Sequence, residues 1–227
     1  MAIGAVRCVV FDLDDTLWHT RETLERAHEA MRGALVTQCP AVEETYGDPA
    51  AFREEMTQTG AEHPGRRHDF TFLRQETLKR LTGSEEIAAS VYETWFLQRN
   101  SPAFFPGALE AVQSLRTAGL KIGTLTDGNS DPMAMEALKG LVDFCVSAAE
   151  AGAPKPDARM FSLCEAKSCC SAAELLMVGD SAEKDVGGAK SAGWRAIWVR
   201  PPSNGSGIAG STWDMSGVTA ASGEGRA

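Results

Sequence analysis

The first residues of this chain that could do chemistry are the acids of Asp12-Leu13-Asp14-Asp15-Thr16, which directly follow the apolar run Cys8–Phe11. A short apolar run is typical of a buried strand in a parallel sheet. Alternate residues of a strand lie on one side, so Asp12 and Asp14 should face together at its carboxyl end, where open α/β sheets bind ligands. Two carboxylates this close repel each other unless a cation lies between them or one keeps its proton. The alternative is that the later acids only cap a following helix.

Two later apolar runs also lead to polar groups that suit an anion. The run 120–126 ends in Thr126, and the turn after it contains Asp127 and Gly128, whose backbone N–H groups can form a nest for an anion. The next run leads through a loop to Lys155, whose backbone is stiffened by a proline on each side. Because parallel strands end at one edge of a sheet, these groups are expected to converge on the acids of the first strand.

A further apolar run, 175–178, ends in Gly179-Asp180, and Asp185 follows. Ordinary structural roles exist for each candidate, since Thr126 and Asp180 are suitable helix caps and Lys155 suits a solvated loop. Suitable groups at four successive strand ends nevertheless favour a common site. A hydroxyl, a lysine and several carboxylates at one edge predict a site for a phosphate and a metal ion.

The elements that would position these groups alternate between strand and helix over residues 104–202. Strands are predicted at 120–126, 142–147, 175–178 and 196–200, and helices at 107–117, 131–139, 157–168 and 182–192. Strands separated by single helices form right-handed βαβ units, which give a parallel sheet with helices on both faces. The predicted fold class is therefore α/β with a doubly wound, Rossmann-like parallel sheet, which the first strand must rejoin.

Residues 17–103 have a helical pattern instead. Apolar side chains recur at helical spacing from Leu24 to Leu35, and further helices are predicted after the capping residues Asp48, Asp69 and Ser84. The chain is therefore expected to form a core domain from residues 1–16 and 104–202, with a helical domain at 17–103 inserted into it. The tail at 203–227 is rich in Gly and Ser and is expected to be loosely ordered.

Composition argues against several classes of partner. A net charge of −9, with no basic run longer than Arg66-Arg67-His68, argues against nucleic acid. No stretch of about 18 apolar residues occurs, so no membrane span is expected. The six cysteines lack metal-ligand spacing and the N-terminus lacks a signal pattern, which favours a cytoplasmic location, or an organelle after removal of a targeting peptide. Both a monomer and a homodimer are compatible with the sequence.

The candidate residues resemble the four motifs of the haloacid dehalogenase (HAD) superfamily in order and spacing. The similar residues are Asp12-Leu13-Asp14-Asp15-Thr16, Thr126, Lys155-Pro156, and Gly179-Asp180 with Asp185. The resemblance covers about residues 5–200, and the insert at 17–103 resembles a C1-type helical cap. Three shorter tracts, 69–74, 99–100 and 126–129, are similar to a bacterial and plant phosphatase subgroup. Some members of that subgroup act on the phosphoribitylaminouracil precursor of riboflavin. The tail lacks the apolar closing segment usual in the superfamily.

The resemblance implies a Mg²⁺-dependent phosphatase that hydrolyses a small phosphorylated metabolite, such as a sugar or polyol phosphate. Asp12 would attack phosphorus to form an aspartyl-phosphate, and Asp14 would protonate the leaving oxygen and then activate water. Phosphoryl oxygens would be held by Thr126, Lys155 and the Asp127-Gly128 turn. The metal ligands would be the carboxylates of Asp12 and Asp180 and the Asp14 carbonyl, with Asp185 acting through water or orienting the others.

Three other functions are considered for the same fold. A C–halogen hydrolase such as a 2-haloacid dehalogenase needs the nucleophile but no acid at Asp14, because halide leaves unprotonated, so Asp14 favours the phosphatase. A phosphomutase needs additional residues in the insert to reorient its substrate, and none can be identified. A non-catalytic binding protein is disfavoured by the complete motifs. Candidates for substrate selection are His19, Arg66, Arg67, Arg74, Trp95 and Arg99.

Overall fold

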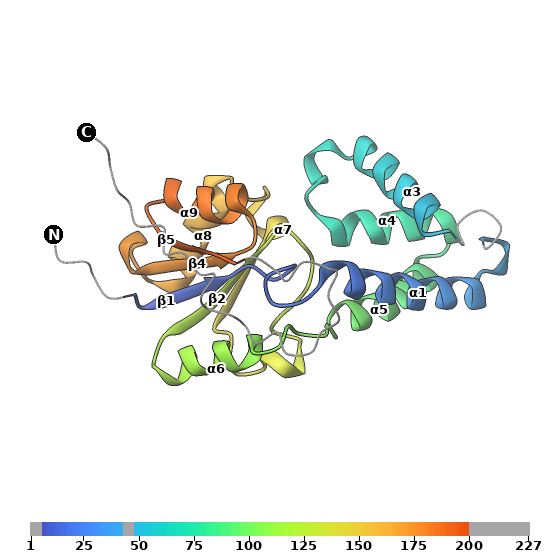
Figure 1. Cartoon of the computed structure of the whole chain (residues 1–227). Coiled ribbons are helices and arrows are strands. Elements are labelled where there is room, and N and C mark those ends of the chain that lie inside the picture. The colour runs from blue at the N-terminus through green and yellow to red at the C-terminus, as the bar shows by residue number, and fades with distance from the viewer. Residues whose placement is uncertain (1–5, 43–47, 200–227) are drawn as a thin grey trace. The chain divides into compact units, whose positions relative to one another are not determined.

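The computed structural model describes residues 6–42 and 48–199, which divide into two compact units (Figure 1). The core unit contains the described residues up to His19, together with Phe104–Asp127 and those from Asp131 onward. The helical unit contains the described part of Thr20–Ala103 and, in addition, Gly128–Ser130. The tail predicted at 203–227 lies outside the described residues.

The core unit contains a five-stranded parallel sheet with the strand order β3-β2-β1-β4-β5. The strands are β1 (Cys8–Phe11), β2 (Lys121–Thr126), β3 (Phe144–Ser147), β4 (Leu175–Gly179) and β5 (Arg195–Trp198). The predicted α/β class is therefore confirmed. The chain continues from β1 to β2 on one side and later returns to β4 on the other side. Such a reversal of strand order opens a crevice at the carboxyl ends of the neighbouring strands, here β1 and β4.

Both faces of this sheet are buried, as a parallel sheet requires. Val9 and Phe11 point into one apolar cluster and Cys8 and Val10 into the other, because neighbouring residues of a strand face opposite sides. Figure 1 shows α6 on one face and α8 and α9 on the other. The helices of the core unit are α6 (Ala108–Thr117), α7 (Ala148–Ala151), α8 (Ala158–Ser168), the π-helical turn η5 (Ala182–Gly187) and α9 (Gly188–Ser191), with short 3₁₀ turns η3 (Glu136–Leu138) and η4 (Ala172–Glu174).

The prediction of a helix at 131–139 is wrong, because the only regular element in this segment is the 3₁₀ turn η3. The Asp131 side chain accepts a hydrogen bond from the backbone N–H of Met133 at 2.9 Å, and such a local turn competes with a helix. Met135 and Leu138 are buried in the core and anchor the segment as an irregular loop. The helix predicted at 157–168 forms as α8, and Cys169 ends it in the left-handed conformation at a φ of 54°.

The helical unit is built from α1 (Thr20–Gln38), α3 (Pro49–Glu62), α4 (Phe70–Thr82) and α5 (Glu85–Arg99), with 3₁₀ turns η1 (Pro40–Val42) and η2 (Pro64–Arg66). The side chains of Asp48, Asp69 and Ser84 each accept a backbone N–H at the start of the following helix, as the sequence predicts. These helices enclose their own apolar core around Met31, Leu78 and Trp95. None of the helices in the described ranges is both long and apolar enough to span a bilayer.

Candidate functional site

The central strand β1 places Asp12 at the carboxyl edge of the sheet, where the residue is 5% exposed. The chain then turns back on itself, because the N–H groups of Thr16 and Leu17 both donate to the Leu13 carbonyl. This turn brings the hydroxyl of Thr16 within 3.1 Å of Asp12 Oδ2, to which it donates a hydrogen bond. The same hydroxyl accepts the backbone N–H of Asp180 at 3.1 Å, so Thr16 links the end of β1 to the end of β4.

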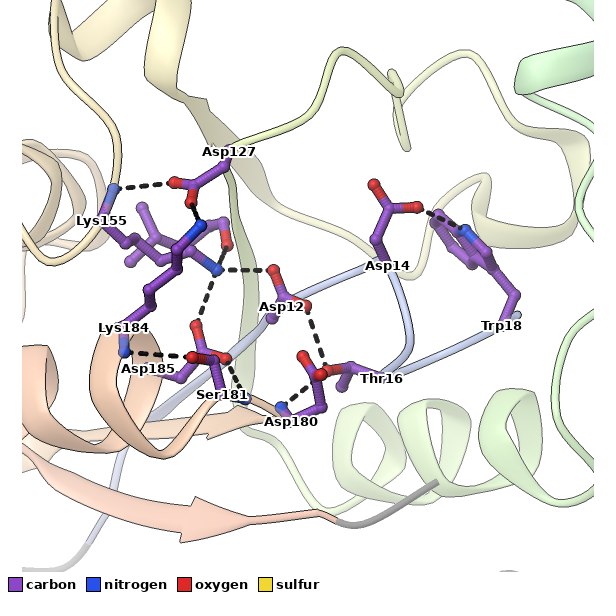
Figure 2. A network of polar contacts seen from close by, with 11 residues as sticks. Asp12, Asp14, Thr16, Trp18, Asp127, Lys155, Asp180, Ser181, Lys184 and Asp185 are labelled. Carbon is purple, nitrogen blue, oxygen red and sulfur yellow. Dashed lines mark hydrogen bonds and ion pairs between the residues drawn. The ribbon is translucent and has the colours of Figure 1, made fainter. Parts of the chain in front are cut away.

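Lys155 reaches this edge from the loop that follows α7 and is 4% exposed. Its Nζ lies 2.5 Å from Asp12 Oδ1, 2.7 Å from Asp185 Oδ1 and 2.9 Å from the Leu125 carbonyl (Figure 2). An ammonium group has three N–H donors, so these three acceptors satisfy it completely. Lys155 therefore neutralises Asp12 directly and holds Asp185 beside it.

Asp127 follows β2 and fixes the loop that carries Lys155. Its Oδ1 accepts the backbone N–H of Lys155 at 2.7 Å, and its Oδ2 accepts Nζ of Lys184 at 2.9 Å. The Asp127 side chain thus joins the ends of β2 and β4 to the lysine loop (Figure 2). Thr126 is buried at the last position of β2, whereas Gly128 groups with the helical unit.

Three carboxylates of the site are spaced to share a cation. One oxygen from each of Asp12, Asp180 and Asp185 lies within 4.8 Å of the others. Among the described residues, the Lys155 ammonium is the cation that pairs with this group, which leaves the three carboxylates and the lysine with a formal charge of −2. Asp185 is already held at its Oδ2 by the N–H of Ser181 at 2.9 Å. Oxygen ligands with this excess of negative charge fit a divalent cation such as Mg²⁺.

The pKa values in the site are shifted in the directions that burial and charge dictate. Burial raises the pKa of Asp12 to about 7, although the charge of Lys155 opposes the shift and Asp185 adds to it. Burial, followed by the charge of Asp185, also raises the pKa of Asp180. For Lys155, burial favours the neutral amine, but the two carboxylates outweigh it and raise its pKa. A bound cation would favour the ionised carboxylates.

Asp14, which the sequence predicts to be catalytic, turns its side chain away from this cluster. Figure 2 shows its carboxylate directed toward Trp18, and the indole Nε1 donates to Asp14 Oδ1 at 2.9 Å. Trp18 is fully buried and packs edge-on against Phe104, with ring centroids 5.3 Å apart. The structure therefore brings Asp12, Lys155 and the two later acids together, and it holds Asp14 apart.

Several residues of this network are absent from the sequence-based site. Thr16 contacts Asp12, Trp18 contacts Asp14, Ser181 contacts Asp185, and Lys184 contacts Asp127. Thr16 lies within the first motif, so its hydroxyl could have been included. The contacts of the other three depend on how neighbouring turns fold, and their sequence positions carry no distinctive signal.

Gly179 has no Cβ, and the Asp185 carboxylate occupies the space that a Cβ would fill. A Cβ at Gly179 would lie 2.3 Å from Asp185 Oδ2, so Gly179→Ala must displace that carboxylate from Lys155. We expect a loss of about 1–3 kcal/mol in the free energy of unfolding. Because sub-ångström placement matters in active sites, turnover should fall by about a hundredfold. The measurements are thermal unfolding and phosphate release.

Gly187→Ala is the matched control for Gly179→Ala. Gly187 has a helical φ of −64° and ψ of −47°, and its added Cβ would meet nothing closer than 3.4 Å. Alanine is favoured over glycine in this conformation, so stability and turnover should be kept. Equal activity of Gly179→Ala and the parent protein would show that the position of Asp185 is unimportant.

A buried aspartate–lysine pair and further acids thus lie together at the carboxyl edge of a parallel sheet. The family model described as haloacid dehalogenase-like hydrolase matches residues 6–193, and the chain belongs to this family. Over 217 residues it is 27% identical to 5-amino-6-(5-phospho-D-ribitylamino)uracil phosphatase YigB of Escherichia coli, covering 93% of this chain and 90% of that protein. It is also 33% identical to phosphoserine phosphatase of Thermus thermophilus over 130 residues, 55% of this chain and 52% of that one.

Among solved structures, the fold is similar to that of a 2-haloacid dehalogenase from Pseudomonas syringae pv. Tomato. The two share 26% identity with a TM-score of 0.78, and the match covers 91% of each chain. The similarity extends over both the sheet and the inserted helices. Phosphatases and dehalogenases are thus both found among the relatives, so the site has to distinguish the two activities.

Proposed function

We propose that this hydrolase is a Mg²⁺-dependent phosphatase that acts on a small phosphorylated metabolite through a phosphorylated Asp12. The observation that carries the proposal is the buried pair of Asp12 and Lys155 beside Asp180 and Asp185. This arrangement offers a nucleophile, an ammonium and a cation site at one edge of the sheet. A phosphate monoester needs all three, because its charge repels an attacking carboxylate.

The repulsion that the site must overcome is large. At about 4 Å and an effective dielectric constant near 20, each pair of like charges costs roughly 4 kcal/mol. The carboxylates of Asp12 and Asp180 and the carbonyl of Asp14 would hold Mg²⁺, which supplies positive charge against the phosphate when bound. Both oxygens of Asp185 already accept hydrogen bonds, from Lys155 and from Ser181. Asp185 would therefore orient Lys155 and the metal ligands rather than bind the ion directly.

Residues of the chain itself would transfer the phosphoryl group, first to Asp12 and then to water. An oxygen of Asp12 attacks phosphorus, and the leaving oxygen takes a proton from Asp14. Asp14 contacts Trp18 in this structure, so its side chain has to rotate before it reaches the leaving group. Thr126 and Lys155 stabilise the phosphoryl oxygens, for which Lys155 must release one of its three acceptors. Asp14 then takes a proton from the water that hydrolyses the aspartyl-phosphate.

For the substrate we propose a small metabolite of the sugar or polyol phosphate type. One curated relative supports this class, because its name specifies a ribityl phosphate. The helical unit would act as the cap that selects the leaving group. Phosphate release across a panel of phosphorylated metabolites with Mg²⁺ tests the proposal. Activity on several small esters is expected, and a panel without any activity would contradict it.

The second candidate is a 2-haloacid dehalogenase, which the structural similarity to the Pseudomonas enzyme favours. That reaction also needs a nucleophilic aspartate, but chloride leaves without a proton. The buried indole that holds Asp14 in place would then have no catalytic purpose. Chloride release from 2-chloropropionate, measured beside phosphate release, separates the two functions. We expect phosphate release alone.

A further inference from the structure

The backbone of Asp180 is held on both sides of its Cα by side chains from two other segments of the core unit. Its N–H donates to the Thr16 hydroxyl at 3.1 Å (Figure 2), and its carbonyl accepts the indole Nε1 of Trp198 at 2.7 Å. Thr16 lies in the turn after β1, and Trp198 is the last residue of β5. These two hydrogen bonds fix the Cα of Asp180 and the direction of its Cβ, so only the side-chain torsions remain free.

The Trp198 indole supplies a hydrogen bond at the point where the pairing of β4 with β5 ends. Gly179 and Trp198 are the last paired residues of the two strands, and the Gly179 carbonyl accepts the backbone N–H of Val199 at 2.9 Å. The carbonyl of Asp180 is one residue further along and is partly buried. Because a carbonyl that is withdrawn from water needs a donor, the side chain of Trp198 takes the place of a further backbone N–H.

The same hydrogen bond also bears on Asp185. The carbonyl of Asp180 and the N–H of Ser181 belong to one planar peptide group, and that N–H donates to Asp185 Oδ2 at 2.9 Å (Figure 2). Rotation of this peptide group would therefore displace the N–H that holds Asp185 as well as the Cα of Asp180. Two of the three carboxylates that are spaced to share a cation thus depend on a peptide group that Trp198 holds.

We propose that Trp198 is a positioning residue of the metal site, which holds the peptide group between Asp180 and Ser181 so that the Asp180 carboxylate is oriented to bind Mg²⁺. The inference rests on the cation site of the proposed function and requires no particular substrate. Trp198 acts through Asp180, because its N–H donates to the backbone of that residue. A ligand that is already held in its binding geometry loses less freedom when the ion binds, so the indole should increase the affinity for Mg²⁺.

Trp198→Phe tests this role, because it removes the N–H donor and keeps most of the aromatic surface. Binding of Mg²⁺ is followed without turnover, by the rise of the thermal midpoint with Mg²⁺ concentration. We expect the apparent Kd for Mg²⁺ to be about fivefold or more higher than in the parent protein, as the loss of one hydrogen bond beside a metal ligand produces. Saturating Mg²⁺ should restore kcat to within about twofold of the parent value, which a purely structural defect would not allow.

Trp194→Phe is the matched control for Trp198→Phe. Trp194 directly precedes β5, and its indole Nε1 also donates a hydrogen bond, to Glu165 Oε1 at 2.8 Å. Its ring packs edge-on against Phe161 in the apolar core. The control should lower the thermal midpoint of the metal-free protein, and its Kd for Mg²⁺ should stay within about twofold of the parent value. An equal rise of Kd in both variants would reflect a general loss of stability and would overturn the proposal.

A tryptophan analogue separates the hydrogen bond of Trp198 from its packing. Replacing Trp198 by benzothienylalanine keeps the size of the indole and puts sulfur in place of the N–H, so Mg²⁺ binding should weaken as in Trp198→Phe. A parent-like Kd with either replacement would overturn the proposal. If Mg²⁺ does not raise the midpoint of the parent protein, the cation site of the proposed function fails and the role of Trp198 fails with it. If the Kd values change as expected but no ester is hydrolysed, the phosphatase function fails and the role of Trp198 stands.

Discussion

Asp12→Asn is expected to abolish the hydrolysis of every phosphate ester, with a loss of at least about 10⁴-fold in kcat. An amide is a poor nucleophile and a weaker metal ligand than a carboxylate. The amide also removes the negative charge that Lys155 contacts at 2.5 Å, so the ammonium is left with Asp185 alone as its ionic partner. Initial rates with several esters at saturating Mg²⁺ give the measurement.

The matched control for Asp12→Asn is Asp157→Asn. Asp157 lies two residues after Lys155, but it is an exposed N-cap whose side chain accepts the N–H of Arg159. Asparagine caps helices as well as aspartate does, so activity should change by less than about threefold. If Asp12→Asn kept a substantial share of the parent rate, Asp12 would not be the nucleophile.

Removal of the divalent cation is the second change with a large expected effect. We expect chelation to lower turnover by about a thousandfold, since a metal ion contributes several kcal/mol to a charged transition state. Ca²⁺ should restore little activity, because it takes more ligands at longer distances and can occupy both oxygens of Asp12. The measurement is phosphate release after chelation and after titration with each ion. Full activity in chelator would contradict the proposed metal site.

Asp180→Asn makes the same test specific to one ligand. The carboxylate of Asp180 is spaced to share a cation with Asp12 and Asp185, and it forms no ion pair within the described ranges. The variant should raise the Mg²⁺ concentration needed for half-maximal activity and should affect kcat less. Unchanged metal dependence would show that Asp180 is not a ligand.

The sequence was sufficient for the fold of the core and for much of the candidate site. Apolar runs that end in Asp12, Thr126 and Asp180 indicate strands and also give the edge at which they end, because parallel strands share one direction. The helix caps Asp48 and Asp69 are equally local signals. Features of this kind depend on a few consecutive residues, and the structure contains them as predicted.

Features that depend on tertiary contacts were not predictable in the same way. The spacing of Asp12 and Asp14 suggests that both carboxylates face one site, but the turn after β1 brings the Trp18 indole to Asp14. Asp185 contacts Lys155 across 30 residues of sequence, a pairing that no periodicity signals. The false helix at 131–139 has the same origin, since burial of Met135 and a side-chain turn at Asp131 outweigh its helical pattern.

The formation of a phosphorylated Asp12 is tested most directly with Asp14→Asn. Its amide oxygen can still accept the Trp18 hydrogen bond, so the change removes proton transfer and keeps the local contact. With p-nitrophenyl phosphate the leaving group departs without a proton, whereas hydrolysis of the intermediate still needs a base. Intact-mass measurement after a rapid acid quench should show one added phosphoryl group on Asp14→Asn and none on Asp12→Asn. Turnover of Asp14→Asn at the parent rate, or a phosphoryl group on Asp12→Asn, would contradict an aspartyl-phosphate formed at Asp12 and released by Asp14.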